Sequence, residues 1–334
     1  MRATAAGGDE SREATLLTAA RAGDEQAFAE LVAPHRPAIH VHCYRMLGSL
    51  HDADDALQET LLRAWRGLDP LEPRGQLRAW LHRISTNVCL RLLERRARER
   101  ATSVAEVSSW LQPYPDHLLD KLPAREPGPD AVAEERETVG LAFVAAMQLL
   151  PARQRAVLVL REVLGWSAAE TAELLGDSVA AVNSALQRAR ARLERERREE
   201  KLAREHLDSR GEAVAIGRFV AAWERVDIPA LMALLADDAV LTMPPEPMRL
   251  VGPEAIGSFF ATVPLEGRLD RIRLLPTRAN GQPALAAYVD AGDGRFQAYG
   301  LMVFSLAGET ITGIVGFANY APLAQAFGLP GELG

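Results

Sequence analysis

The segment from residue 166 to residue 192 constrains the fold most strongly, because it encodes two short helices around a glycine. Ser167 can cap the first helix, and Glu170, three residues later, can reach back to the capping residue. Gly176 supplies the turn, and Ser178 can cap the second helix. The apolar side chains of that second helix recur every three or four positions, which predicts one buried face. They are Val182, Leu186, Ala189 and Leu193. The pattern is typical of a helix-turn-helix.

The opposite face of the second helix is polar and basic. It carries Asn183, Ser184, Gln187, Arg188, Arg190 and Arg192. A helix fits the DNA major groove, where amides and guanidiniums reach base edges and arginines neutralise phosphates. A soluble helical hairpin can also have a capped start, a glycine and a charged outer face without binding DNA. From these residues alone, DNA binding and a solvated hairpin are both open.

Composition favours several domains without a membrane segment. The chain has 334 residues, of which 48% are hydrophobic and 25% charged, enough for two or three cores. No apolar run approaches the roughly 18 residues that a bilayer requires, and the polar N-terminus lacks a signal core. We therefore expect a cytoplasmic location, no membrane partner and disorder over residues 1–15.

The two cysteines, Cys43 and Cys89, are too few for a disulfide framework and form no C-x-x-C pair. His40 and His42 flank Cys43 closely, but neighbouring positions on a helix point in different directions. No metal and no cofactor are expected. The net charge of -7 is unevenly distributed, since arginines gather from Arg91 to Arg100 and from Arg188 to Arg198.

Residues 16–100 have helical periodicity throughout, and they divide into two functional stretches. Between residues 52 and 68, one face carries a mixture of acids, an amide and a leucine: Asp55, Gln58, Glu59 and Leu62. This mixture suits a protein partner, although a solvated face steadied by a Glu59–Arg63 pair would look alike. After breaks at Pro70, Pro73 and Gly75, a long helix has a buried stripe and an opposite stripe suited to phosphates. That opposite stripe is Arg83, Asn87, Arg91, Arg95 and Arg98.

With these motifs in order, residues 25–207 resemble a bacterial sigma-70 superfamily factor of the extracytoplasmic-function group. YRMLGSLHDADDALQETLLRAWRGL resembles the part of region two that docks on the clamp helices of the largest RNA polymerase subunit. GQLRAWLHRISTNVCLRLLERRARER resembles the helix that recognises and opens the minus-ten promoter element. LLPARQRAVLVLREVLGWSAAETAELLGDSVAAVNSALQRARARL resembles region four, which binds the minus-thirty-five element and the beta-subunit flap.

The resemblance implies roles for individual residues. The residues implied in polymerase docking are Asp55, Gln58, Glu59, Leu62 and Trp65. Those implied in minus-ten contacts are Arg83, Asn87, Arg91, Arg95 and Arg98. Those implied in minus-thirty-five contacts are Ser178, Asn183, Ser184, Gln187, Arg188, Arg190 and Arg192. Asn87 stands where family members hold a flipped base, which offsets an unstacking cost of a few kcal/mol. The family's common Lys-Ser-Arg run is replaced by Asn183, Ser184 and Ala185. With a salt slope of about -0.9 per phosphate contact, we expect weaker and less salt-sensitive minus-thirty-five binding.

Residues 101–137 are rich in proline and acidic residues, which predicts an extended linker. Within it, WLQPYPDHLLD is unexpectedly apolar. Sigma factors with an additional C-terminal domain carry a similar motif that contacts that domain. The resemblance thus implies an interdomain contact through Trp110, Leu111, Pro113 and Tyr114, with packing on region two as the alternative. Region four is expected over residues 138–204.

The last segment, residues 208–334, starts with a helix and continues with short strands separated by hairpin turns at 280–281, 293–294 and Gly308. It is expected to be an α+β domain with a curved antiparallel sheet, and it resembles the polyketide-cyclase-like (SnoaL) branch of the NTF2-like family, a cone around a pocket. The segment contains no histidine and no cysteine. Its candidate acids lie at a strand start or a turn: Asp237, Asp238, Asp290 and Asp293. We therefore expect no enzyme.

The predicted protein is multidomain, with two all-α sigma modules followed by an α+β cone. Its predicted function is an alternative sigma factor that binds core polymerase and promoter DNA and is regulated in cis by its C-terminal domain. Two alternatives are a one-component, ligand-responsive DNA-binding regulator and a cyclase or isomerase with a DNA-binding module.

Overall fold

The computed structural model describes residues 3–68, 77–100, 111–122, 139–199, 209–244, 246, 248–292, 294–318 and 321–334. The chain divides into two units. The first comprises Met1–Ala105 with Leu118–Glu196, and the second comprises Glu106–His117 with Arg197–Gly334. Each unit is described by itself. Within the described part of the chain, every helix is too short or too polar to cross a bilayer.

The first unit begins with helices whose ends follow from local sequence. They are α1 (Ala3–Arg21), α2 (Glu25–Val32), the short η1 (Ala33–His35), α3 (Arg36–Leu47), α4 (Leu50–Arg66) and α5 (Leu77–Arg100). The Asp24 carboxylate caps α2, and the Ser49 hydroxyl caps α4 by accepting from the Asp52 amide. Gly48 ends α3 in the left-handed conformation at a φ of 72°. These local signals determine where the helices start and end without help from tertiary contacts.

The expectation of disorder over residues 1–15 differs from the structure, in which α1 starts at Ala3. Leu17 and Ala20 near the end of α1 are buried, and α1 packs against α2. A turn anchored by packing removes the nucleation cost, and the alanines before it favour propagation. The polar residues at the start of α1 therefore extend a helix that is nucleated by the packing of Leu17 and Ala20.

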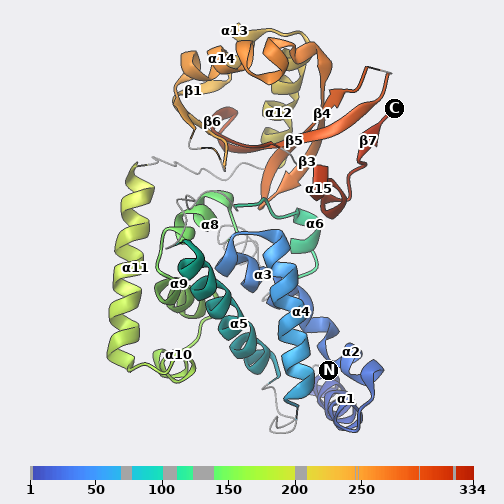
Figure 1. The fold of residues 1–334 in the computed structure, drawn as a ribbon, viewed down its shortest axis with the longest axis vertical. Coiled ribbons are helices and arrows are strands. Elements are labelled where there is room, and N and C mark those ends of the chain that lie inside the picture. The colour runs from blue at the N-terminus through green and yellow to red at the C-terminus, as the bar shows by residue number, and fades with distance from the viewer. Residues whose placement is uncertain are drawn as a thin grey trace. The chain divides into compact units, whose positions relative to one another are not determined.

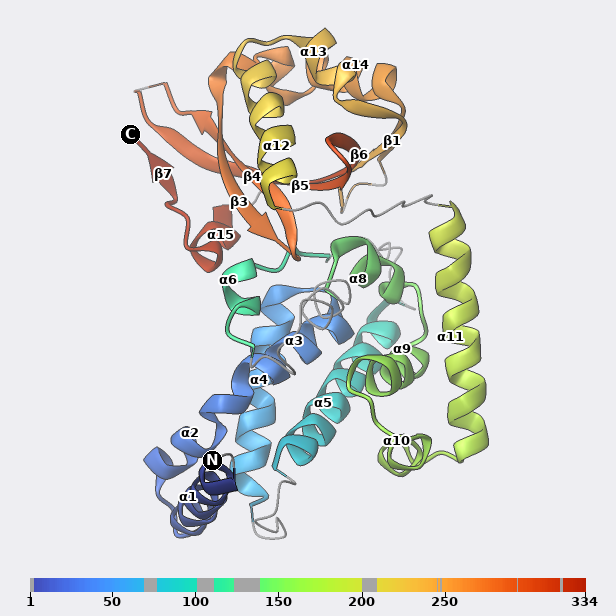
Figure 2. The same ribbon diagram turned by 180° about the vertical axis from the view of Figure 1, so that it is seen from behind.

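The core of this unit lies between α3, α4 and α5, which run side by side in Figures 1 and 2. Every residue of α3 from Ile39 to Leu47 is buried, including three polar side chains. The predicted inner face of α4 is buried at Ala56, Leu57, Thr60 and Ala64. A helix buried all round is typical of the centre of a bundle.

The remaining helices of the first unit include the predicted helix-turn-helix. They are α8 (Leu141–Gln148), α9 (Ala152–Leu158), the π-helical η3 (Val159–Val163), α10 (Ala168–Leu175) and α11 (Val179–Glu199). The short α6 (Asp116–Leu119) precedes them in the chain. The π-turn lets Val159 and Leu160 remain buried while the chain leaves α9 for the loop before α10.

The second unit combines helices with one seven-stranded sheet. Its helices are α12 (Ser209–Glu224), α13 (Ile228–Ala233), α14 (Pro253–Thr262), α15 (Ala321–Ala324), η4 (Pro264–Gly267), η5 (Leu269–Arg271) and η6 (Gln325–Phe327). Its strands are β1 (Leu235–Thr242), β2 (Arg249–Val251), β3 (Ile272–Ala279), β4 (Gln282–Asp290), β5 (Phe296–Ala307), β6 (Thr310–Ala318) and β7 (Glu332–Leu333). The order is β2-β1-β6-β5-β4-β3, and β7 pairs with β5.

Two of the predicted hairpin turns are confirmed. Asn280 and Gly281 connect β3 to β4 with φ values of 59° and 72°, as a two-residue turn of the primed type requires. Gly308, at a φ of 60°, lies in the turn between β5 and β6. Asp293 of the third predicted turn lies outside the described residues. The sheet is not purely antiparallel, because β1 pairs with β6 in parallel.

The parallel pair is possible because a long connection, containing α14 and strands β2 to β5, separates β1 from β6 in the sequence, whereas α12 and α13 precede β1. Antiparallel neighbours need only a tight turn, whereas parallel ones need a long connection. Helices α12, α13 and α14 lie together on one side of the sheet (Figures 1 and 2) and share its core through Phe219, Leu231 and Phe260. A curved sheet closed by helices on one face leaves room for a cavity between them.

Candidate nucleic-acid and polymerase-binding surfaces

The helix-turn-helix has the predicted local chemistry. The Ser167 hydroxyl accepts from the Glu170 amide at 3.2 Å, and the Glu170 carboxylate accepts from the Ser167 amide at 2.7 Å. Gly176 ends α10 at a φ of 63°. The Ser178 hydroxyl accepts from the Ala181 amide at 3.1 Å, so it caps α11. These short-range bonds fix the angle at which α11 leaves the turn.

Helix α11 buries Val182, Leu186 and Ala189, and Leu193 is half-buried. On the other side, exposed polar side chains form what we call the α11 polar face: Asn183, Gln187, Arg188, Arg190 and Arg192, with Ser184 half-buried among them. Two arginines already have partners. Arg188 donates to Ser184 at 2.6 Å, and Arg190 pairs with Glu162 at 2.5 Å.

Helix α5 presents what we call the α5 stripe. Asn87, Arg91, Arg95 and Arg98 are exposed, while Leu81 and Val88 on the inner side are buried. Arg83 at the start of the stripe is half-buried, and its guanidinium forms an ion pair with Glu173 of α10. One predicted DNA-contacting arginine is therefore held by a helix 90 residues away in the sequence.

Helix α4 presents what we call the α4 exposed face. Asp55 and Gln58 are exposed, and Leu62 has 51% of its surface accessible. Glu59 pairs with Arg63 at 2.6 Å along the helix. Trp65 is half-buried, with its ring centroid 5.1 Å from that of Phe28 on α2 in an edge-on arrangement. This packing fixes the indole, so only part of it is available to a partner.

Arg155 of α9 connects the helices of region four to α3 through buried hydrogen bonds. The sequence analysis did not predict this role. Its side chain is only 4% exposed. The guanidinium donates to the carbonyl and the side-chain oxygen of Gln148, to the Leu150 carbonyl and to the Met46 carbonyl. Gly48 lies against the same Gln148 side chain, because a Cβ at position 48 would come within 2.7 Å of it. Gln148 and Leu150 lie only seven and five residues earlier in the chain, but the Met46 carbonyl lies 109 residues away, and no local pattern marks the arginine as buried.

The histidines of the first unit form no metal site. No group of three or more His, Cys, Asp or Glu side chains in the described ranges is arranged to hold a metal ion. His42 contacts Thr86 through Nε2 at 2.9 Å. Since the Thr86 hydroxyl donates its proton to the His82 carbonyl at 2.7 Å, the His42 Nε2 must be the donor. Burial, aided by Arg45, lowers the pKa of His42 from 6.5 to about 3, so the ring is neutral.

Cys43 and Cys89 are free and fully buried. Burial first, and a hydrogen bond with Cys43 second, raise the pKa of the Cys89 thiol well above its usual value. A protonated, inaccessible thiol is unreactive. These residues belong to the core.

Within the described part of the linker, residues 111–117 belong to the second unit. Tyr114 is completely buried. Its amide donates to the Asn280 side-chain oxygen at 2.8 Å, and its carbonyl accepts from the Asn280 amide at 2.8 Å. Pro115 forms a β-bridge with Ala279. We call this contact the linker clamp.

Charged groups extend the linker clamp. Asp116 accepts from the Gly281 amide at 2.8 Å and from Arg278 at 3.1 Å, and Arg278 also donates to Glu212 of α12 at 2.6 Å. Leu111 is half-buried and Pro113 is buried, while Trp110 lies outside the described residues. Asn280 was predicted only as a turn residue, and its buried, fully engaged side chain was missed.

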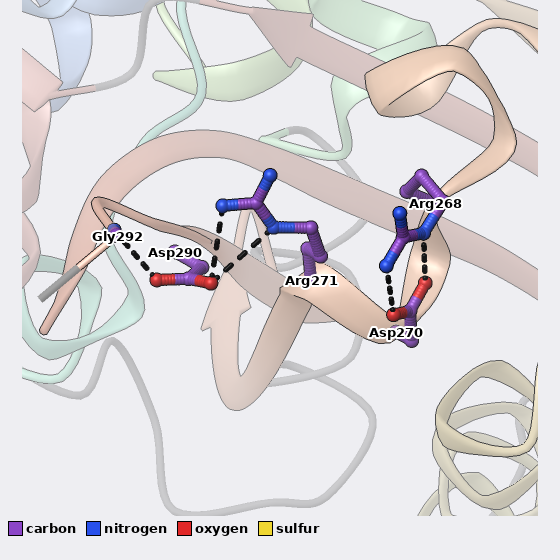
Figure 3. A network of polar contacts seen from close by, with 5 residues as sticks. All are labelled: Arg268, Asp270, Arg271, Asp290 and Gly292. Atoms are coloured by element: carbon purple, nitrogen blue, oxygen red, sulfur yellow. Dashed lines mark hydrogen bonds and ion pairs between the residues drawn. The ribbon is translucent and has the colours of Figure 1, made fainter. Parts of the chain in front are cut away.

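The candidate acids of the C-terminal domain are not arranged as a proton-transfer pair. Asp237 and Asp238 are exposed in β1. Figure 3 shows Asp290 accepting from Arg271 at 3.2 and 3.3 Å and from the Gly292 amide at 2.7 Å. Beside it, Arg268 makes a two-pronged contact with Asp270. These contacts order the loop around η5 and the β4–β5 turn.

Comparison with known proteins identifies the family. The Sigma-70 region 2 model matches residues 31–99, the Sigma-70, region 4 model matches residues 140–193, and the SnoaL-like domain model matches residues 216–314. The ECF RNA polymerase sigma factor SigG of Mycobacterium tuberculosis is 41% identical over 327 residues, covering 94% of this chain and 86% of that protein. The chain belongs to the ECF RNA polymerase sigma factors.

A second relative matches a little over half of this sigma factor. The ECF RNA polymerase sigma factor SigM of Mycobacterium tuberculosis is 36% identical over 189 residues, covering 57% of this chain and 86% of that protein. The crystal structure of the extracytoplasmic function sigma factor SigJ of Mycobacterium tuberculosis covers 91% of this chain and 99% of that chain with a TM-score of 0.60 at 24% identity. The predicted architecture, two helical sigma modules and an NTF2-like cone, is confirmed.

The match boundaries place the surfaces within the family's modules. The α4 exposed face and the α5 stripe up to Arg98 lie inside the region 2 match, and the α11 polar face lies inside the region 4 match. The linker clamp residue Asn280 lies inside the SnoaL-like match, whereas Tyr114 lies between the two sigma matches.

Proposed function

We propose that this sigma factor docks on core RNA polymerase through the α4 exposed face, opens and reads the minus-ten element with the α5 stripe and binds the minus-thirty-five element with the α11 polar face. Its C-terminal domain regulates these steps in cis and performs no catalysis. The sigma modules likewise act by binding alone.

The exposure of Leu62 supports polymerase docking. A half-exposed leucine among Asp55 and Gln58 contributes no core packing, yet it supplies apolar area with a polar rim, the usual composition of a protein interface. Glu59, held toward Arg63 along the helix, adds charge at the edge.

The exposure of Asn87, Arg91 and Arg98 supports contact with an opened DNA strand, because phosphates need accessible cations and a flipped base needs a polar pocket. Arg83 reaches a phosphate only after its ion pair with Glu173 opens. Promoter binding therefore competes with the ion pair between α5 and α10. In that pair, the Glu173 carboxylate binds the Arg83 guanidinium that would otherwise bind a phosphate.

The linker clamp is the observation that carries cis-regulation. The segment that connects region two to region four is bonded to the β3–β4 turn of the C-terminal domain through a backbone bond from the Asn280 amide to the Tyr114 carbonyl, a side-chain bond from the Tyr114 amide to Asn280 and a β-bridge at Pro115. In the family the equivalent linker threads the polymerase active-site cleft. One segment cannot occupy a β-bridge and that cleft at once, so the C-terminal domain controls how much linker is free to enter polymerase.

Co-migration with sigma-free core polymerase tests the docking step. The Leu62→Ala variant should bind core at least fivefold more weakly, because an exposed interface leucine contributes about 1 kcal/mol or more. Val251→Ala is the matched control, since Val251 is exposed to a similar extent, at 49%, but lies on β2 of the C-terminal domain, outside both sigma modules.

Equal core affinity for both variants and the parent chain would contradict the docking surface. A chain that does not bind core at all would instead be a one-component DNA-binding regulator. Turnover of a small molecule that depends on Asp237 or Asp238 would contradict a purely regulatory C-terminal domain.

A further inference from the structure

Two histidines lie against each other in the core of region two. His42 on α3 is 0% exposed, and His82 on α5 is 1% exposed. Their ring centroids are 5.1 Å apart, and the ring planes are nearly perpendicular, at 85°. The contact between α3 and α5 therefore buries two side chains that titrate near neutral pH in water.

The two rings have few hydrogen-bond partners. His42 Nε2 contacts the Thr86 hydroxyl at 2.9 Å. His42 Nδ1 and both ring nitrogens of His82 make no hydrogen bond to any described residue. Leaving buried polar atoms unpaired is unfavourable, and a buried charge without a counter-charge is more unfavourable still. The folded core therefore holds both imidazoles in the neutral form.

The charged groups around the pair also oppose protonation. Burial lowers the pKa of His82 well below its usual value, and nearby histidines and cations lower it further: His42, Arg78, Arg45 and His35. Burial, aided by Arg45, likewise lowers the pKa of His42 to about 3. Helix α9 adds another buried cation, Arg155, against the same core.

The acids of the neighbouring elements do not offset these cations. Those on α4 and η3 have partners of their own: Asp52 with Arg96, Asp54 with His40, Asp55 with His51, Glu59 with Arg63 and Glu162 with Arg190. An imidazolium formed in this core would therefore face like charges.

The same turns of α5 carry residues proposed to contact promoter DNA. His82 and Thr86 are buried, whereas Arg83 and Asn87, the next residues in the chain, belong to the α5 stripe. Separating the buried side of these turns from α3 therefore also displaces the side that carries Arg83 and Asn87.

We propose that the His42–His82 pair makes region two acid-sensitive: opening of the contact between α3 and α5 takes up two protons, so acidification withdraws the α5 stripe from DNA. In the opened state both rings return to an ordinary pKa of 6.5, so the opened state binds protons more tightly and is favoured as the pH falls below that value. The proton uptake follows from the buried pair alone, whereas its effect on transcription rests on the proposed function.

Hydrogen exchange of peptides covering residues 81–90 in the full chain, expressed as protection factors, measures the opening equilibrium. From pH 7 to pH 5.5, each imidazole should raise that equilibrium about 8-fold, and the pair should raise it about 70-fold. His82→Phe and His82→Gln each remove one titrating ring, so each should reduce the change to about 8-fold. His51→Gln on α4 is the matched control, because its side chain is 75% exposed, and it should keep the change of the parent chain.

Run-off transcription with core polymerase tests the consequence. The ratio of activity at pH 5.5 to activity at pH 7 should be higher for His82→Phe than for the parent chain, and the effect of pH on polymerase itself is common to both. Equal ratios would overturn the link to DNA binding. Transcription from neither chain at either pH would contradict the proposed sigma function, and the exchange experiment would still decide the proton uptake.

Three exchange results would overturn the proton uptake. The first is a change in parent protection below about threefold between the two pH values. The second is a full-sized change in both His82→Phe and His82→Gln. The third is a reduction in His51→Gln as large as in the His82 variants.

Discussion

Replacing Asn280 with glycine should loosen the linker clamp while preserving the turn that carries it. Asn280 has a φ of 59°, which glycine adopts without strain. The substitution removes the side-chain oxygen that accepts from the Tyr114 amide at 2.8 Å, whereas the bond from the residue-280 amide to the Tyr114 carbonyl remains. A buried amide left without its acceptor costs about 1–3 kcal/mol.

Hydrogen exchange on the full chain measures this cost at the residue concerned. Since about 1.4 kcal/mol corresponds to a tenfold change in an equilibrium, the Tyr114 amide should exchange roughly 5-fold to 140-fold faster in Asn280→Gly. The control is Tyr288→Phe, which removes a different hydrogen bond of the same unit, from the Tyr288 hydroxyl to the Pro330 carbonyl at 2.8 Å. In Tyr288→Phe, the Tyr114 amide should exchange at the same rate as in the parent chain. Unchanged Tyr114 exchange in Asn280→Gly would refute the linker clamp as described.

Three further outcomes are expected. In Glu173→Gln, the ion pair with Arg83 is lost, so the salt dependence of promoter binding should steepen by about one phosphate contact, a slope change near -0.9. Glu194→Gln, an exposed carboxylate on α11, removes the same charge away from Arg83 and should change the slope by less than half as much. The pKa of His42 is about 3 in the folded chain against 6.5 ordinarily, so the unfolded chain binds the proton more tightly. Urea unfolding should therefore show the free energy of unfolding falling from pH 7 to pH 4.5, with His42 alone contributing about 2.5 kcal/mol. A flat profile over that range would contradict a buried neutral imidazole. Arg155→Met should lower the free energy of unfolding by about 3 kcal/mol, because it leaves buried carbonyls without donors, and a loss below 0.5 kcal/mol would contradict its role as a fastener.

Features fixed by short-range chemistry were predictable from the sequence. The capping box of Ser167 and Glu170 needs only residues three apart, and the Asn280–Gly281 turn needs only its own dihedral angles. The buried and polar faces of α11 follow equally from its periodicity. The order of the sigma modules and the cone follow instead from the resemblance to the sigma-70 and NTF2-like families.

Features fixed by distant partners were not predictable. The pairing of Arg83 with Glu173 and the burial of Arg155 depend on how α9 and α10 pack on α3 and α5, which no local pattern encodes. The parallel alignment of β1 with β6 depends on sheet closure in the same way. The helix that begins at Ala3 shows the reverse case, in which packing near Leu17 orders a polar sequence.

Run-off transcription with sigma-free core polymerase tests the central claim most directly, comparing the full chain with a form truncated after Arg204 on a promoter bound by the full chain. Our account predicts that transcription requires the added chain and that its level changes when the C-terminal domain is removed. Transcription that depends on the chain but is identical for both forms would contradict cis-regulation, and no transcription from either form would contradict the proposed role in initiation.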